Sequence, residues 1–444
     1  MGKTKKGSQT LPPITAVTVC GYKSLVSAQT VEIRPLTILA GANSSGKSSI
    51  MQPLLLMKQT LAESSDPGAI LLEGDNVKCT SVDDLLPKHP DPNCKNGFWV
   101  TLEFGHERKA LTKVTTYYVK SNGGFRIREM RYQEPGEQEI SWREGMSHDD
   151  IAPHVPKEFQ SFPTDFSKKG KWRVARRRCF LELLVDTGKE TYALGLTPAA
   201  SAVVNMQRII HLPGLRGNPA TTYLVRAVGR EFPGQFQDYV ASVIYKWQKA
   251  GSKNLEGVKE DLSRLNLTWK VYAERVLDTR VELRVGRLSH SVRGGAKDLV
   301  NIAHVGFGVS QALPVVVALR AALKNQLVYI EQPEIHLHPK AQIAMADLLV
   351  AAANRGVRVV AETHSALLLL AIQTALAKGK IAPSAVKLHW FQRDEQGCTK
   401  VTSVDPDEKG RFGDWPEDFA TTELEAENRY LDAVEKEEGK VQNG

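Results

Sequence analysis

Residues 41–48 read Gly41-Ala-Asn-Ser-Ser-Gly46-Lys47-Ser48, which matches the phosphate-binding pattern G-x-x-x-x-G-K-S. An apolar run at 36–40 precedes this pattern and a helix-like stretch at 49–58 follows it, which is the strand–loop–helix setting that the pattern requires. The glycines let backbone N–H groups converge on phosphates, and the helix N-terminus adds partial positive charge. Lys47 is expected to reach the β- and γ-phosphates, and the Ser48 hydroxyl to bind Mg²⁺. The sequence therefore predicts binding of a nucleoside triphosphate.

Two later apolar runs are expected to be buried strands that end in polar residues. The first, 326–330, leads into Glu331-Gln332-Pro-Glu334. An acidic residue at the tip of a buried parallel strand is where such proteins hold the other side of Mg²⁺. The second, 359–361, leads into Glu362-Thr-His364-Ser, whose histidine is expected to lie near the γ-phosphate.

A third segment, 305–311, contains Gly308, Ser310 and Gln311 and opens an apolar helix that is expected to run to about Leu323. Glycines and a serine at a helix start form a second anion-binding nest. One nucleotide does not need two such nests in one chain. The second is therefore expected to serve the nucleotide of another copy.

This order of loop, serine nest, acidic strand and histidine strand resembles the ABC-type ATPase heads, and most closely the overcoming-lysogenization-defect, RecF, Rad50 and SMC-like group. The run Ile330-Glu-Gln-Pro-Glu-Ile-His-Leu-His-Pro339 is similar to one in stand-alone ATPases of bacterial antiviral operons of the Septu or PARIS type. The run 410–417, Gly-Arg-Phe-Gly-Asp-Trp-Pro-Glu, also resembles a tail of that group. The resemblance covers roughly residues 14–60 and 300–420. It implies an α/β P-loop ATPase of ABC-head type, with a mixed sheet and an insertion of strands and helices.

The resemblance also implies roles for individual residues, with ATP and Mg²⁺ as cofactors. The metal ligands would be Ser48 and Glu331. Nucleotide-binding residues would be Gly41, Asn43, Ser44, Gly46, Lys47, Ser48 and Ser49, with Gly308, Ser310 and Gln311 facing the nucleotide of the opposite subunit. The catalytic set would be Lys47, Glu331, Gln332, Glu334 and His364.

Gln332 departs from the family pattern, which places there the glutamate that orients or deprotonates the attacking water. An amide can position water but cannot accept its proton. Either Glu334 substitutes, or hydrolysis is slow and the bound state is long-lived. The sequence favours slow hydrolysis.

The chain has 444 residues, of which 42% are hydrophobic and 24% charged, values ordinary for a globular protein. No run approaches the ~18 apolar residues of a membrane span, and the basic N-terminus has no apolar signal core. The five cysteines are odd in number and scattered, so we expect thiols in a reducing cytosol. A cytoplasmic protein without membrane contact is expected.

Five regions are expected along the chain. They are a basic tail at 1–13, the first part of the ATPase core at 14–95, an inserted subdomain at 96–299, the second part of the core at 300–400, and a C-terminal tail at 401–444. Within the insertion, alternation predicts strands at 98–104, 113–119, 125–130 and 179–185, helices across 197–266, and strands at 267–272 and 280–285. Residues 150–171 are expected to form a loop.

The net charge of +8 favours an acidic partner but does not say whether it is a nucleic acid or a protein. The run 168–178, with Trp172 among lysines and arginines, could follow a nucleic-acid backbone, form a solvated edge strand, or dock an acidic protein. Arg284, Arg287 and Arg293 form a weaker basic group.

Two further patterns have a local explanation that the sequence favours over a chemical one. His336 and His338 lack a third ligand of matching spacing, so they are expected to shape a turn. Asp405-Pro-Asp407 resembles the D-x-D of a nuclease that follows the ATPase in overcoming-lysogenization-defect proteins, but too little chain remains after Ser365 to form one. No intrinsic nuclease is expected.

A nucleotide switch without an effector implies a separate effector chain. The leading hypothesis is a slowly hydrolysing ATPase that acts as sensor or scaffold in an anti-phage complex. It would pair with itself as a homodimer or higher oligomer through ATP-sandwiched heads and control a separate nuclease or toxin. The alternative is a RecF-like DNA repair ATPase that binds DNA. A transporter ATPase is a weaker option, because the serine nest departs from L-S-G-G-Q and the insertion is rich in strands.

Overall fold

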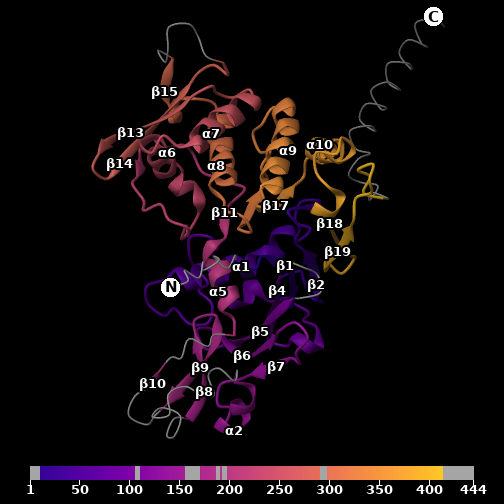
Figure 1. The fold of residues 1–444 in the computed structure, drawn as a ribbon. Helices are drawn as coiled ribbons and strands as arrows, with labels where there is room; N and C mark the ends of the chain where they lie inside the picture. The colour runs from indigo at the N-terminus through magenta and orange to yellow at the C-terminus, as the bar shows by residue number, and fades with distance from the viewer. Residues whose placement is uncertain are drawn as a thin grey trace, which may run out of the picture.

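The computed structural model describes residues 11–105, 111–155, 171–186, 191–192, 198–290 and 298–413 (Figure 1). Several sequence predictions fall outside this part of the chain. They concern most of the basic tail, Lys168, Lys169, Arg293, most of the expected loop at 150–171, the end of the 410–417 run and most of the C-terminal tail.

The strand before the phosphate loop lies inside a six-stranded sheet with the order β11-β16-β17-β3-β18-β19. Its strands are β3 (Leu36–Gly41), β11 (Ile210–Leu212), β16 (Leu327–Glu331), β17 (Arg358–Thr363), β18 (Val386–Arg393) and β19 (Thr399–Val404). All neighbours from β11 to β18 are parallel, and β19 pairs antiparallel with β18. The predicted α/β fold with a mixed sheet is therefore confirmed.

Two hydrophobic cores lie on opposite faces of this central sheet. Every residue of β3 is buried, and its side chains alternate between the cores: Leu36 and Ile38 face one, Leu39 the other. The first core includes residues of α8 (Phe307–Ala321), α9 (Pro339–Asn354) and α10 (Ala366–Ala377). The second includes the helix after the phosphate loop, α1 (Lys47–Ala62). Figure 1 shows α8 to α10 on one side of the sheet and α1 with the N-terminal strands on the other.

Three further sheets surround the central one. A six-stranded antiparallel sheet has the order β2-β1-β4-β5-β6-β7, a second contains β10-β9-β8, and a third contains β12-β14-β13 with β15 added to β14. The bounds are β1 (Ile14–Cys20), β2 (Gln29–Glu32), β4 (Gly97–Phe104), β5 (Thr112–Ser121), β6 (Gly124–Gln133), β7 (Ile140–Trp142), β8 (Lys171–Arg177), β9 (Phe180–Asp186), β10 (Thr191–Tyr192), β12 (Tyr223–Leu224), β13 (Val271–Leu277), β14 (Arg280–Gly286) and β15 (Leu299–Asn301).

The remaining α-helices are α2 (His148–Ile151), α5 (Ala200–Arg208), α6 (Val240–Lys249) and α7 (Lys253–Arg264). Short 3₁₀ segments occur at Val82–Leu85, Pro92–Cys94, Ala152–His154, Phe236–Tyr239, Ile302–His304 and Pro383–Ala385. No helix within the described ranges is both long and apolar enough to cross a membrane.

The prediction of helices across 197–266 is wrong for its middle part. Residues 210–212 form β11, which joins the central sheet beside β16, and residues 223–224 form β12. All side chains of β11 are buried, but a strand this short shows no period in the sequence. The predicted strand at 267–272 starts later, at Val271, where β13 begins.

The sheets also run across the expected domain limits. β4 lies beyond residue 96 and pairs with β1, while β11 lies within the expected insertion and pairs with β16. The expected C-terminal tail starts inside β19. The assignment of 96–299 to an inserted subdomain remains a prediction, although strands from this region contribute to the same sheets as the core.

Lys58 is a charged side chain in the second core. Its Nζ donates to the Gly234 carbonyl at 2.7 Å, and only 1% of its surface is exposed. Burial lowers the pKa of Lys58 to about 7, and the charge of Asp75 opposes this shift only in part. The amine on the phosphate-loop helix therefore changes charge near neutral pH.

Because the unfolded lysine keeps its proton to about pH 10.5, unfolding takes up a proton between pH 7 and 10.5. The free energy of unfolding should rise with pH across this window, by up to roughly 5 kcal/mol from this group. Urea unfolding at pH 7, 8, 9 and 10 measures it, with Lys58→Met as the comparison. The difference between parent and variant should change steeply with pH; a constant difference would contradict a shifted pKa.

Candidate active site

The phosphate loop requires glycine at two positions because the chain is close-packed around it. Gly41 has φ +145°, and a Cβ there would lie 2.3 Å from the Phe391 carbonyl oxygen. Gly46 has φ +100°, and a Cβ there would lie 2.2 Å from Thr399 Oγ1. Gly46 precedes α1 without a side-chain cap, so the first N–H groups of this helix remain available to an anion.

Lys47 is folded back onto this loop. Its Nζ donates to the carbonyls of Gly41 and Ala42 at 3.0 and 2.7 Å and contacts Ser45 Oγ at 3.4 Å. Burial lowers the pKa of Lys47, while the charge of Glu362 opposes this shift. Asn43 and Ser44 are exposed at the tip of the loop, and Ser49 donates its N–H to the Gly46 carbonyl. The lysine is thus a cation held at the loop by neutral oxygens, which anionic phosphates can replace.

Three strand ends meet beside the loop. The pairing of β16 with β17 sets Glu331 opposite Glu362, and the pairing of β17 with β3 sets Thr363 opposite Ala40. Parallel strands with aligned ends bring their C-terminal residues to one edge of the sheet. This edge collects the acidic residues that the sequence placed near the phosphates.

Glu331 has both carboxylate oxygens occupied by the chain. Its Oε1 lies 3.1 Å from His211 Nε2, and its Oε2 accepts the Gly214 N–H at 3.1 Å. Burial raises the pKa of Glu331, but the hydrogen bonds of His211 and Gly214 outweigh it and leave the pKa below its usual value. Glu331 is therefore ionised at neutral pH.

His211, on β11, is buried and stacks on the Tyr329 ring with centroids 5.4 Å apart. Burial lowers the pKa of His211, so the ring is neutral and donates from Nε2 to Glu331. Its Nδ1 then needs a donor and lies 3.2 Å from the Asn76 amide oxygen. Rotating that amide supplies the donor, because Asn76 Nδ2 has no other partner in the described structure.

Ser48, the expected Mg²⁺ ligand, contacts Glu362 and not Glu331. Its Oγ donates to Glu362, with Oε1 and Oε2 each 3.0 Å away. Tyr329 donates its hydroxyl to Glu362 Oε2 at 2.9 Å. Burial raises the pKa of Glu362, and the negative charge of Glu331 adds to this shift. Hydroxyl and carboxylate oxygens are the ligands that Mg²⁺ prefers, so this edge fits the ion in its chemistry.

Gln332 follows β16 in a left-handed conformation with φ +48°. Its N–H donates to the Glu362 carbonyl at 2.7 Å, which fixes the backbone of the turn. The buried guanidinium of Arg216 donates to the carbonyls of Glu331 and Gln332 at 2.7 and 3.2 Å. The amide that replaces a carboxylate therefore lies on a rigid turn.

Glu334 and His364 lie together on the other side of this turn. Glu334 Oε1 accepts from Thr363 Oγ1 at 2.5 Å and from the His364 N–H at 3.2 Å, while its buried Oε2 has no partner among the described residues. Burial raises the pKa of Glu334. Burial lowers the pKa of His364, and the nearby Lys47 charge adds to this. Glu334 is thus a buried carboxyl with a raised pKa and one oxygen that lacks a hydrogen-bond partner among the described residues.

The serine nest lies at the start of α8. Ser310 is buried, and its Oγ donates to the Phe307 carbonyl at 3.0 Å in the same turn. Gln311 donates its side-chain N–H to the Gly217 carbonyl, and Gly308 is partly buried. The described residues show no contact between this nest and the phosphate loop. Its role toward a second copy stays a prediction.

The structure brings Lys47, Ser48, Glu331, Gln332, Glu334 and His364 together at one sheet edge, whereas Gly308, Ser310 and Gln311 lie elsewhere. The roles of these residues remain predictions. Sequence analysis missed the contributions of His211, Arg216, Tyr329 and Glu362. The first two come from the segment expected to be helical. Glu362 was visible as a polar residue at a strand end but received no role.

The other sequence candidates have local partners. His338 caps α9 through Lys340 N–H, and the His336 ring packs against Phe307 with centroids 5.7 Å apart. Asp405 forms ion pairs with Arg34 and Lys387, and Asp407 accepts hydrogen bonds from Arg411. Among the described residues, no group of three or more His, Cys, Asp or Glu side chains could hold a metal ion.

The basic run is also largely engaged. Arg176 pairs with Asp66, Arg177 with Glu182, and Arg178 donates to the Thr60 carbonyl at 2.7 Å. Trp172 is half-buried and packs on the second core. These contacts favour the structural interpretation of β8 over a nucleic-acid surface.

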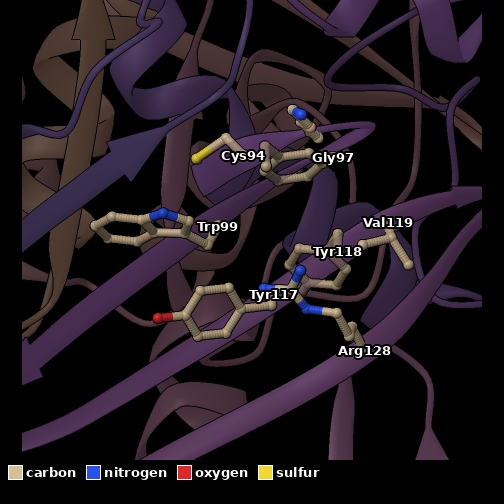
Figure 2. Close-up of a pocket in the computed structure, with 9 residues that line it drawn as sticks. Cys94, Gly97, Trp99, Tyr117, Tyr118, Val119 and Arg128 are labelled. Atoms are coloured by element: carbon tan, nitrogen blue, oxygen red, sulfur yellow. The ribbon is translucent and has the colours of Figure 1, made fainter. Parts of the chain in front are cut away.

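A small pocket lies on the antiparallel sheet, formed by β4, β5, β6 and the segment before β4 (Figure 2). Trp99 and Tyr117 lie on neighbouring strands with centroids 6.0 Å apart, and the Arg128 guanidinium lies 5.2 Å from the Tyr117 centroid. Buried Cys94 lines the pocket, and its Sγ is 2.8 Å from that of Cys20. Arg131 also lies over the Tyr117 ring, 4.9 Å from its centroid, so arginines already cover this aromatic side chain.

A family model described as "AAA domain, putative AbiEii toxin, Type IV TA system" matches residues 125–371. This range spans 247 residues (371 − 125 + 1), more than half of the 444-residue chain. The chain belongs to this AAA-domain family. The match includes α8, β16 and β17 but begins after the phosphate loop, which follows β3 of the same central sheet.

Comparison with curated proteins finds no significant match. Among solved structures, the chain is similar to an SMC head bound to the C-winged helix domain of ScpA, with 14% identity, a TM-score of 0.47, and coverage of 89% of this chain and 98% of that one. It is also similar to the SMC head domain from Thermotoga maritima (11% identity, TM-score 0.41, 88% and 99% covered). A third match is the Smc head domain with an extended coiled coil bound to the C-terminal domain of ScpA derived from Pyrococcus furiosus (11%, 0.45, 96% and 100%). Likeness at this level bears on neither the activity nor the partners of this AAA-domain protein.

Proposed function

We propose that this protein is a slowly hydrolysing, Mg²⁺-dependent ATPase that acts as the nucleotide-controlled subunit of a defence or toxin system. The observation that carries the proposal is the edge where Lys47 and Ser48 meet Glu331, Glu334 and Glu362. Bound Mg²⁺ would neutralise phosphate charge. Lys47 and the free N–H groups at the start of α1 would hold the phosphates. A water would be held near Gln332 and Glu334.

Slow hydrolysis is supported by the chemistry at the turn. The Gln332 amide can hold a water but cannot take its proton. Glu334, the other candidate base, is buried and already accepts hydrogen bonds from Thr363 and the His364 N–H, which restrict its movement toward a water. Slow hydrolysis keeps ATP bound for longer than an encounter with a partner protein lasts, which is what a nucleotide-controlled switch needs.

A separate effector is supported by the family description, which names an AbiEii toxin and a type IV toxin–antitoxin system. The central experiment is expression of the chain with its neighbouring genes, followed by purification through a tag on this chain. A stable complex with a nuclease or toxin supports the proposal. Salt-sensitive DNA binding by the chain alone, with no protein partner, would favour the RecF-like alternative.

We further propose that ATP pairs two copies through the serine nest. Ser310→Arg should leave nucleotide binding to one copy intact, because Ser310 does not contact the phosphate loop, yet block ATP-dependent pairing by placing a large cation in the nest. Light scattering with a non-hydrolysable ATP analogue measures the mass. Leu323→Arg, just beyond the other end of α8 at an exposed position, is the matched control.

Ser310 is buried, so the melting temperature of the variant must be recorded beside its mass. Ser310→Ala, which removes only the hydroxyl, serves if the arginine variant unfolds. Parent-like pairing and hydrolysis by a folded Ser310→Arg variant would leave the nest with a local role only.

A further inference from the structure

Glu362 is the carboxylate that contacts the Ser48 hydroxyl, the expected cation ligand, in the part of the chain that the structure describes. The Ser48 hydroxyl, placed by the phosphate loop, is 3.0 Å from each oxygen of Glu362. Glu362 is 6% exposed and extends from the tip of β17, the strand next to β3. Its position is fixed because the Tyr329 hydroxyl donates to Oε2 and the Gln332 N–H binds its carbonyl.

Glu331 has the opposite arrangement. Its two oxygens face His211 and the Gly214 N–H, and no contact joins it to Ser48. Both oxygens are turned toward the β11 side, where the buried His211 imidazole and the Gly214 N–H hold them. Glu331, on the neighbouring strand β16, is better placed to influence the cation through its negative charge than to bind it.

We propose that Glu362 is the carboxylate that, with the Ser48 hydroxyl, holds the metal ion of the bound nucleotide, and that Glu331, fixed by His211, is a positioning residue behind it. The assignment rests on the proposed ATPase function. In the free protein the hydroxyl donates to Glu362. When the hydroxyl oxygen faces a cation, its hydrogen still points away from that cation toward one carboxylate oxygen, and the remaining lone pairs of the carboxylate are available to the ion.

Tyr329 completes the arrangement as a second positioning residue. It lies on β16, is fully buried, and donates its only O–H to the carboxylate oxygen Oε2. Its ring also stacks on His211, the partner of Glu331. Tyr329 therefore contacts Glu362 directly and Glu331 through His211. Removing this hydroxyl should loosen Glu362 without changing the charge of the site.

The test measures Mn²⁺ binding to the full chain by electron paramagnetic resonance, in the presence of a saturating non-hydrolysable ATP analogue. Glu362→Gln should weaken Mn²⁺ affinity about 10- to 100-fold, and Tyr329→Phe by less, the range seen for residues in and around metal sites. Nucleotide affinity in EDTA should not fall below that of the parent, because glutamine keeps the shape of glutamate and removes a negative charge from beside the phosphates. Glu362→Asp, which keeps a carboxylate, should recover part of the loss, and Asp347→Asn, on the surface of α9, is the matched control.

Unchanged Mn²⁺ affinity in Glu362→Gln, or a larger loss in Glu331→Gln than in Glu362→Gln, would overturn the assignment. The EDTA measurement separates misfolding from metal loss, because a misfolded variant would lose nucleotide binding as well. A parent that binds neither ATP nor its analogue would overturn the proposed function together with this assignment. If the parent binds nucleotide and Mn²⁺, and the Glu362→Gln variant binds both with the same affinity, only the assignment of Glu362 is overturned.

Discussion

Replacing Lys47 by alanine is expected to weaken ATP binding by at least about 100-fold, because two charge-assisted contacts to phosphate oxygens are lost, together worth about 3 kcal/mol. No other lysine contacts the phosphate loop in the described structure. Isothermal titration with ATP and Mg²⁺ gives the affinity, and any activity of a complex with a partner should disappear in parallel.

Lys47 also binds carbonyls of its own loop, so the variant needs a check of its fold. Melting of the nucleotide-free protein should change little, because the loop keeps its glycine geometry and its contact between Thr399 and the Ser45 carbonyl. Lys380→Ala, at an exposed ion pair with Asp347, is the control for loss of one positive charge. Parent-like ATP affinity in Lys47→Ala would remove the basis for the proposed function.

The second large effect is expected at Gln332. Because the amide cannot accept a proton, the parent should hydrolyse ATP on the order of 1 s⁻¹ or more slowly. Gln332→Glu should raise kcat about 10- to 100-fold, less than the full range of 10²–10⁴ for a well-placed base, since the carboxylates of Glu331 and Glu362 lie nearby. The backbone can keep its conformation, because its N–H and carbonyl contacts do not involve the side chain.

Acid-quenched single-turnover hydrolysis, which counts bound and free phosphate together, separates this effect from product release. Glu334→Gln is the companion variant, since its unpartnered oxygen makes Glu334 the other candidate base. Loss of hydrolysis in Glu334→Gln, together with no change in Gln332→Glu, would place the base two residues further along the turn. A slow switch limited by the missing carboxylate would then be the wrong description.

Local sequence was sufficient to predict the phosphate loop and the strands beside it. The order of strand, glycine loop and helix is contiguous, and the chemistry of Lys47 and Ser48 depends on backbone geometry that these glycines dictate. The apolar runs ending at Glu331 and Thr363 are parallel strands as predicted, because buried strands with both faces covered are apolar throughout.

The partners of the acidic residues could not be predicted from local pattern. His211 reaches Glu331 only because a three-residue strand from the middle of the chain pairs with β16. Glu362 contacts Ser48, 314 positions earlier in the sequence, because β17 inserts between β16 and β3. Which carboxylate faces the hydroxyl depends on strand order and on hydrogen bonds from distant segments, and neither leaves a periodic signal.

Arg216 connects the turn at the end of β16 with the first turns of α8. Its guanidinium donates to the carbonyls after β16 and contacts the Gln311 carbonyl of α8 at 3.4 Å, while its neighbour Leu215 is 83% exposed. A ligand that shifts the β16 turn must therefore displace this buried cation, or move α8 and the surface loop with it. Thermodynamic linkage makes this coupling reciprocal. If bound nucleotide changes the affinity of a partner for that loop by some factor, the bound partner changes the affinity for nucleotide by the same factor.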